Sequence, residues 1–109
     1  MTKLILKENP TLADFQEWIK IMRKERGFDD ESIIEECLLL GEEVGELFKA
    51  IRKHHTKIVF DDETSQNTEV AHELADVFNM LLCVANSAGI NLEDAFRNKE
   101  NINKKRKWK

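Results

Sequence analysis

Apolar residues recur every three or four positions through most of the chain, with charged residues between them. This spacing is the pattern of amphipathic helices. Local start and stop signals divide the pattern into four segments. The segments cover about residues 11–26, 30–53, 68–88 and 91–107. The sequence therefore predicts an all-α fold of four helices, with a single domain spanning residues 1–109.

The expected helix ends depend on capping residues. Thr11 and Asp14 have the spacing of a capping box, and Gly27 is placed to end the first helix. Asn91 is placed to cap the fourth helix. A polar connector with one short apolar patch covers residues 54–67, between the second and third helices. We expect this connector to be a loop that is either mobile or folded over a site as a lid.

The two central helices repeat one acidic pattern. The second helix contains EVGELF from Glu43, and the third contains ELADVF from Glu73. On a helix that turns ~100° per residue, Glu43 lies about 40° from Leu47, and Glu73 lies about 40° from Val77. Each acid thus falls inside an apolar face, where a solvated surface role does not fit.

Each central helix carries a second acid three residues after the first, so both can reach one ion. The four acids are Glu43, Glu46, Glu73 and Asp76. Carboxylates that share a dry interior repel one another and lose hydration unless a cation binds them. Oxygen ligands favour a hard cation, Mg²⁺, with Mn²⁺ as a substitute. Glu36 shares the same face and is either an auxiliary ligand or a surface or capping residue.

Small residues lie on the opposite faces of the central helices, and they are Gly41, Gly45, Ala71 and Ala75. Both central helices are therefore apolar on two sides. The shorter outer helices can cover only part of this surface. A homodimer that buries the remainder is the simplest expectation.

The composition narrows the class of protein. Charged residues make up 35% and hydrophobic residues 41% of the chain, which is typical of helices with solvated outer faces. The net charge of −4 argues against general polyanion binding. No run approaches the ~18 apolar residues that cross a bilayer, and the start of the chain does not read as a secretory signal. We expect a cytoplasmic protein without a membrane partner, in which Cys37 and Cys83 are buried and reduced.

The sequence GEEVGEL at residues 41–47, followed by ELADV at residues 73–77, resembles the EExxE…ExxD signature of the all-α nucleoside triphosphate pyrophosphohydrolases. This is the MazG-like group, which includes the dCTP pyrophosphatases. The resemblance spans about residues 11–107 and is to the short, stand-alone type. It implies a MazG-like four-helix bundle, assembled as a dimer or a dimer-based tetramer. It also implies that Mg²⁺ is bound by Glu43, Glu46, Glu73 and Asp76.

The implied activity is Mg²⁺-dependent hydrolysis of a nucleoside triphosphate to the monophosphate and pyrophosphate, in house-cleaning of the nucleotide pool. Glu43 and Glu46 are the candidate catalytic carboxylates, as metal ligands or as a general base. Relatives contact phosphate and sugar through a Lys-xxx-Asn-xx-Arg pattern, and stack the base on aromatic residues near the chain start. The corresponding substrate-binding candidates are Lys99, Asn103, Arg106, Trp18 and Phe28. The alternative role of Lys99 and Arg106 is a solvated basic face, and that of Trp18 and Phe28 is core packing. Any base preference is compatible with this pattern.

Two other hypotheses about the function are open beside a pyrophosphohydrolase. Glu69 and His72 form an ExxH motif, but a carboxylate-bridged di-iron bundle needs two such motifs. The second alternative is a non-enzymatic helical interaction module that binds nucleic acid through the basic tail at residues 104–109. The tail is short and belongs to an acidic protein, so we expect nucleotide rather than nucleic acid as the partner.

Overall fold

A computed structural model describes residues 4–58, 60 and 69–108, which form helices and connecting segments with no strand among them. The helices are α1 (Leu12–Arg26), α2 (Ile33–His55), α3 (Val70–Ser87) and α4 (Leu92–Asn103). The predicted all-α fold with four helices is confirmed. The expected start of the third helix at residue 68 lies outside the described residues, as do residues 61–67 of the connector.

Capping side chains begin α1 and α2. The Thr11 hydroxyl accepts a hydrogen bond from the Asp14 amide at 3.1 Å, and the Asp14 carboxylate accepts one from the Thr11 amide at 2.8 Å. Ser32 and Glu35 form the same reciprocal pair, so α2 begins at residue 33 rather than near residue 30. The backbone hydrogen bonds from Thr11 and Ser32 lower the pKa of Asp14 and of Glu35, respectively. At the other end of α1, Gly27 has φ +80°, a left-handed conformation that favours glycine.

The fourth helix is shorter than predicted, since it ends at Asn103 instead of near Lys107. A longer helix would use the Asn103 carbonyl to accept the Lys107 amide. The Trp108 indole donates to that carbonyl instead, at 2.9 Å, and the Arg106 guanidinium lies 4.8 Å from the Trp108 ring centroid. The Trp108 side chain therefore contacts the last turn of α4.

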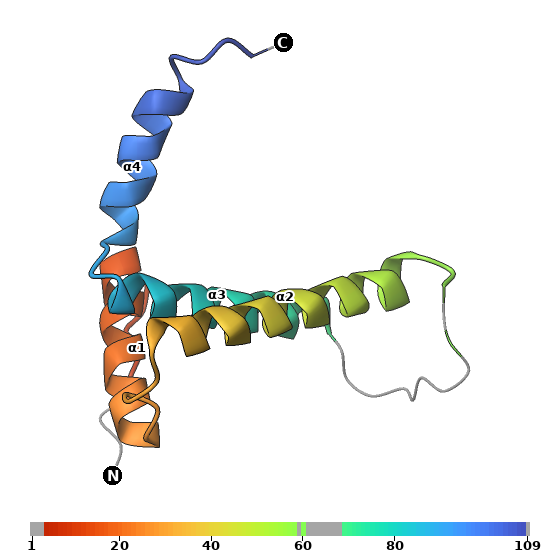
Figure 1. The fold of residues 1–109 in the computed structure, drawn as a ribbon, viewed down its shortest axis with the longest axis horizontal. Helices are drawn as coiled ribbons and strands as arrows, with labels where there is room; N and C mark the ends of the chain where they lie inside the picture. The colour runs from red at the N-terminus through yellow and green to blue at the C-terminus, as the bar shows by residue number, and fades with distance from the viewer. Residues whose placement is uncertain (1–3, 59, 61–68, 109) are drawn as a thin grey trace.

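The α2 and α3 helices lie side by side as a long antiparallel hairpin, and α1 crosses one end of this hairpin (Figure 1). The core lies where α1 meets α3 and consists of Ile19, Met22, Leu82 and Cys83. A turn of 93° separates α3 from α4, so α4 runs away from the hairpin (Figure 1). Within one chain, α1 and α4 thus do not lie parallel to the hairpin as the remaining members of a four-helix bundle.

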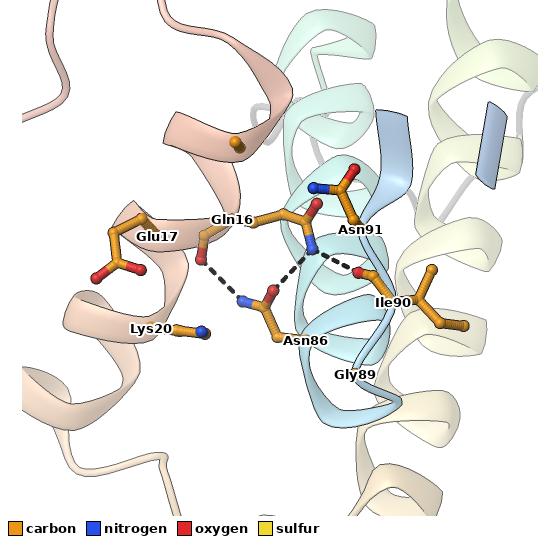
Figure 2. Close-up of a pocket in the computed structure, with 8 residues that line it drawn as sticks. Gln16, Glu17, Lys20, Asn86, Gly89, Ile90 and Asn91 are labelled. Carbon is orange, nitrogen blue, oxygen red and sulfur yellow. Dashed lines mark hydrogen bonds between the residues drawn. The ribbon is translucent and has the colours of Figure 1, made fainter. Parts of the chain in front are cut away.

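A buried polar side chain ties these elements together. Gln16 of α1 hydrogen-bonds to Asn86 near the end of α3 and to the corner that leads into α4 (Figure 2). The corner between α3 and α4 is therefore fixed relative to α1.

The two cysteines differ in environment. Cys83 is 2% exposed in the core, and burial raises the pKa of its thiol. Cys37 is exposed, so the prediction that both cysteines are buried is wrong for Cys37. Its neighbour Leu38 is also largely exposed, because this part of α2 has no covering element in the single chain. Both cysteines are free thiols, as expected.

Over the described residues, none of the four helices alone has the length and hydropathy of a membrane span, although the bent pair α3–α4 meets these criteria by length and composition.

Candidate metal centre and nucleotide site

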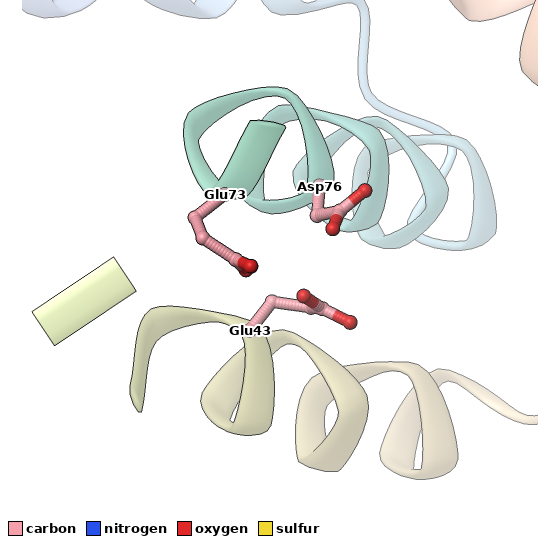
Figure 3. A group of neighbouring side chains, drawn as sticks. All are labelled: Glu43, Glu73 and Asp76. Atoms are coloured by element: carbon pink, nitrogen blue, oxygen red, sulfur yellow. The ribbon is translucent and has the colours of Figure 1, made fainter. Parts of the chain in front are cut away.

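Three of the four predicted metal ligands meet between α2 and α3. Glu43 projects from α2, and Glu73 and Asp76 project toward it from α3 (Figure 3). One carboxylate oxygen from each residue lies within 4.8 Å of the other two. Glu73 and Asp76 are one helical turn apart, so the pairing of α2 with α3 places both beside Glu43. This geometry could hold one cation.

The environment of Glu43 disfavours its ionised form. Burial raises the pKa of this carboxyl, which is partly exposed between the two helices. The charges of Asp76 and Glu73 raise the pKa further, and those of Glu46 and Glu42 add to the effect. A bound cation would offset this repulsion. Oxygen donors alone make up the group, which suits a hard divalent ion better than zinc.

Glu46 lies one turn beyond Glu43 on α2 and is exposed. Its carboxylate is not part of the converging group, although its charge is close enough to affect the pKa of Glu43. Asp76 is also exposed. The predicted shared interior is therefore open to solvent on one side in this chain, because no described element covers that edge of the hairpin.

A cavity of about 500 Å³ extends from the carboxylates toward the end of α1. Glu43 and Asp76 line it at the hairpin. Its further walls include Arg23, Arg26, Phe28, Glu31, Asn79 and Met80. Small-molecule sites commonly have this size and combine an apolar or aromatic wall with a few polar groups. The cavity could hold the organic part of a ligand whose anionic groups face a cation at the carboxylates.

The structure brings some predicted substrate-binding residues to this cavity and leaves others elsewhere. Phe28 lines it, and this residue is 48% exposed. Trp18 packs against the core instead, with the Arg26 guanidinium 5.9 Å from its ring centroid. The remaining candidates, Lys99, Asn103 and Arg106, lie on or after α4 and line no part of this cavity.

Sequence reasoning missed Arg23, whose side chain is nearly buried beside the cavity. Its Nη1 lies 2.9 Å from Glu36 Oε2, and its Nη2 donates to the Phe28 carbonyl. Glu36 is fully buried and also accepts a hydrogen bond from the Ser87 hydroxyl. Glu36 is thus paired with an arginine and is neither a surface residue nor part of the converging carboxylates. Its position on the apolar face was the available signal, since a buried carboxylate needs a cationic partner.

The ExxH motif lies at the surface. His72 Nε2 is 3.6 Å from Glu69 Oε2, and the two side chains are 72% and 59% exposed. The converging ligands found among the described residues include no histidine. This geometry gives the di-iron alternative no support.

The fold and the site together define a class: all-α proteins whose central hairpin carries convergent carboxylates beside a cavity. The sequence model of the MazG nucleotide pyrophosphohydrolase domain matches residues 28–108, so the chain belongs to the MazG family. Bacillus subtilis (strain 168) YvdC, an uncharacterised protein, is 30% identical over 91 residues, which cover 79% of this chain and 86% of YvdC.

Solved structures agree with this assignment. The structure of iMazG from Vibrio DAT 722 is 32% identical, with a TM-score of 0.62, and covers 87% of this chain and 95% of iMazG. Bacillus subtilis YpjD shares the fold at 24% identity, with a TM-score of 0.72, and covers 93% of this chain and 100% of YpjD. Family membership supports nucleotide pyrophosphohydrolase activity, as the resemblance implied.

Proposed function

We propose that this protein is a Mg²⁺-dependent nucleoside triphosphate pyrophosphohydrolase that converts (d)NTP to (d)NMP and pyrophosphate and so clears unwanted nucleotides from the pool. The observation that carries the proposal is the convergence of Glu43, Glu73 and Asp76 at one end of a cavity of nucleotide size. Membership of the MazG family supports the class of reaction.

Glu43, Glu73 and Asp76 are the residues that would hold the metal ion. Their oxygen atoms are the ligands that Mg²⁺ prefers, and Mn²⁺ has the same preference. When bound, the ion offsets charge on the phosphate oxygens and favours ionisation of a nearby water. Its charge would also lower the pKa of Glu43, which burial and the neighbouring carboxylates raise.

Glu46 is proposed as the general base. It lies one turn from Glu43 but outside the converging group, so its carboxylate is left to accept a proton from the attacking water. The water oxygen joins phosphorus, and the α–β phosphoanhydride bond breaks with release of pyrophosphate. A fourth-ligand role for Glu46 stays a prediction, which a metal-binding measurement separates from the role of base.

A homodimer is also part of the proposal. Ile34, Leu38 and Phe48 are 70%, 66% and 69% exposed, and they share one face of α2 with Gly41 and Gly45. An apolar face of this kind is a protein-interaction surface. A second hairpin packed on it would complete the four-helix bundle that one chain does not form, and two such dimers would make a tetramer.

The dimer would also account for the basic residues on α4 and directly after it. Lys99 and Arg106 lie away from the carboxylates of their own chain, and Phe96 on the same helix is 72% exposed. We propose that α4 covers the site of the partner subunit, where Lys99, Asn103 and Arg106 contact the phosphate tail.

Product analysis tests the activity. Purified protein is incubated with standard and modified nucleoside triphosphates and Mg²⁺, and both products are quantified. We expect monophosphate and pyrophosphate in equal amounts from at least one nucleotide, and none from Glu43→Gln protein purified in parallel. Release of diphosphate and orthophosphate would contradict the assignment. Binding of nucleic acid that disappears on deletion of residues 104–109, without nucleotide turnover, would favour the interaction module instead.

A further inference from the structure

We propose that Arg23 is a positioning residue that holds Phe28 as a wall of the nucleotide cavity and thereby sets which base fits. The proposal rests on the proposed function. It concerns the loop at residues 27–32, which joins α1 to α2 and borders the cavity through Phe28 and Glu31.

Arg23 holds both backbone polar groups of Phe28. The Phe28 amide donates to the Arg23 carbonyl at 2.7 Å, and Arg23 Nη2 donates to the Phe28 carbonyl. The backbone at this position is therefore fixed to the last turn of α1. The Phe28 side chain is left to border the cavity, where it is about half exposed.

The guanidinium is in turn anchored to the hairpin. Arg23 Nη1 lies 2.9 Å from Glu36 Oε2 on α2 and 3.9 Å from Glu31 Oε1. The hydroxyl of Ser87, the last residue of α3, donates to Glu36. One arginine thus links the end of α1, the loop and both helices of the hairpin that carries the carboxylates.

These contacts argue against a direct phosphate contact by Arg23. Its side chain is only 10% exposed, and its donors face Glu36, Glu31 and Phe28. Stability alone is also a weak reason for the pair, because a buried ion pair can often be replaced by apolar residues without loss of stability. An apolar pair cannot, however, donate a hydrogen bond to the Phe28 carbonyl. Positioning of Phe28 is the role that needs a guanidinium.

The test is the double variant Arg23→Met/Glu36→Met, which removes both charges and keeps apolar volume. The control is Lys24→Met, which removes an exposed charge from the same turn of α1 and does not line the cavity. In the folded double variant we expect KM for the preferred nucleotide to rise at least ~10-fold, with kcat within ~3-fold of the parent. The preference for that base over a poor one should fall, and amide exchange at residues 27–32 should accelerate at least ~10-fold.

A conservative variant tests the proposal even if the double variant does not fold. Arg23→Lys keeps a charge for Glu36, but a single ammonium cannot reach both Glu36 and the Phe28 carbonyl in the same geometry. We expect it to reproduce the rise in KM and the faster exchange in part. If the double variant fails to fold, unchanged KM and unchanged exchange in Arg23→Lys overturn the proposal.

Parental values of KM, base preference and loop exchange in a folded double variant would likewise overturn it. If the proposed function is wrong, the result differs from failure of the Arg23 proposal, because the parent protein would then hydrolyse no nucleotide. In that case amide exchange at residues 27–32 alone decides whether Arg23 positions the loop.

Discussion

Gln16 and Asn86 hydrogen-bond to each other in both directions across the contact between α1 and α3 (Figure 2). The Gln16 side-chain amide donates to Asn86 Oδ1 at 2.9 Å, and the Asn86 side-chain amide donates to the Gln16 backbone carbonyl at 2.9 Å. Gln16 also donates to the Ile90 carbonyl at 2.8 Å and accepts from the Leu92 amide at 2.9 Å. One buried side chain therefore fixes the start of α4.

Replacement of this side chain should cost stability. Gln16→Leu leaves the partly buried Ile90 carbonyl and Leu92 amide without their partner. An unsatisfied buried group costs about 1–3 kcal/mol, and partly buried groups lie at the lower end. We expect a loss of about 2–4 kcal/mol in the free energy of unfolding, measured by urea denaturation. The neighbouring exposed residue gives the control, Glu17→Gln, which should change little. Equal stability of both variants would contradict the role given to Gln16.

Much of the secondary structure could be predicted from the sequence because interactions between residues close in sequence determine it. The period of apolar residues places the helices, and the side chain of Thr11 marks the start of α1 within its own turn. The direction of α4 is not readable in this way. It depends on the hydrogen bonds of Gln16 to Ile90 and Leu92, which lie 74 and 76 positions away and belong to no motif.

The difference between local and long-range interactions also applies to the candidate metal site and its surroundings. The convergence of Glu43 and Glu73 could be predicted because helical phase places each inside an apolar face, and the spacing of one helical turn adds Asp76. The partner of Glu36 could not, since several basic residues precede α2 and only the crossing of α1 selects Arg23. Periodicity shows which face of a helix is buried, but it does not show which neighbour covers that face.

Removal of a converging carboxylate should abolish turnover. Glu43→Gln and Glu73→Gln each keep the shape of the side chain but remove a charge that holds the cation. We expect each to lower kcat/KM at least ~10²-fold in the pyrophosphate-release assay. Glu42→Gln is the matched control, because Glu42 is exposed and lies outside the converging group. A similar loss in the control, or near-parental turnover by both test variants, would refute the site.

Measuring turnover and metal binding together distinguishes a general-base role of Glu46 from a metal-ligand role. As a general base, Glu46→Gln should lower kcat ~10²–10⁴-fold. Its Tm should still rise on addition of Mg²⁺ as in the parent protein, whereas Glu43→Gln should lose both turnover and this rise. Loss of the Mg²⁺-induced rise in Glu46→Gln would instead make Glu46 the fourth ligand.

Mixed dimers test whether α4 and the segment after it serve the partner subunit. Glu43→Gln lacks a carboxylate but keeps Arg106, whereas Arg106→Ala keeps all the carboxylates but lacks this basic side chain. If the site is shared, co-expressed chains form heterodimers with one intact site each. A statistical mixture should then recover about a quarter of parental activity, although each variant alone is nearly inactive. If both groups serve one chain, mixing recovers nothing. Mass measurement by light scattering confirms that the sample is dimeric.

Acidity should control how strongly Mg²⁺ stabilises the protein. The pKa of Glu43 in the folded state lies above its ordinary value of 4.5, so folding without metal favours the protonated form. The stability contributed by that form is present at low pH and is lost as pH rises through the raised pKa. Metal binding requires the ionised form, so the rise in Tm produced by Mg²⁺ should grow from pH 5 to pH 7.5.

The Tm measurements stay above pH 5 because Asp14 and Glu35 change the stability in the opposite direction to Glu43 as the pH falls. Their pKa values are lowered, so their stabilisation persists at higher pH and is lost only in acid, below their ordinary values of 3.8 and 4.5. At pH 7.5, Mg²⁺ at ~100-fold above its Kd should add about 2.7 kcal/mol to the stability of the parent protein. Glu43→Gln imitates the protonated side chain, so without metal it should be at least as stable as the parent at pH 7.5 and gain nothing from Mg²⁺. A Mg²⁺ effect that is independent of pH and equal in both proteins would place the ion elsewhere.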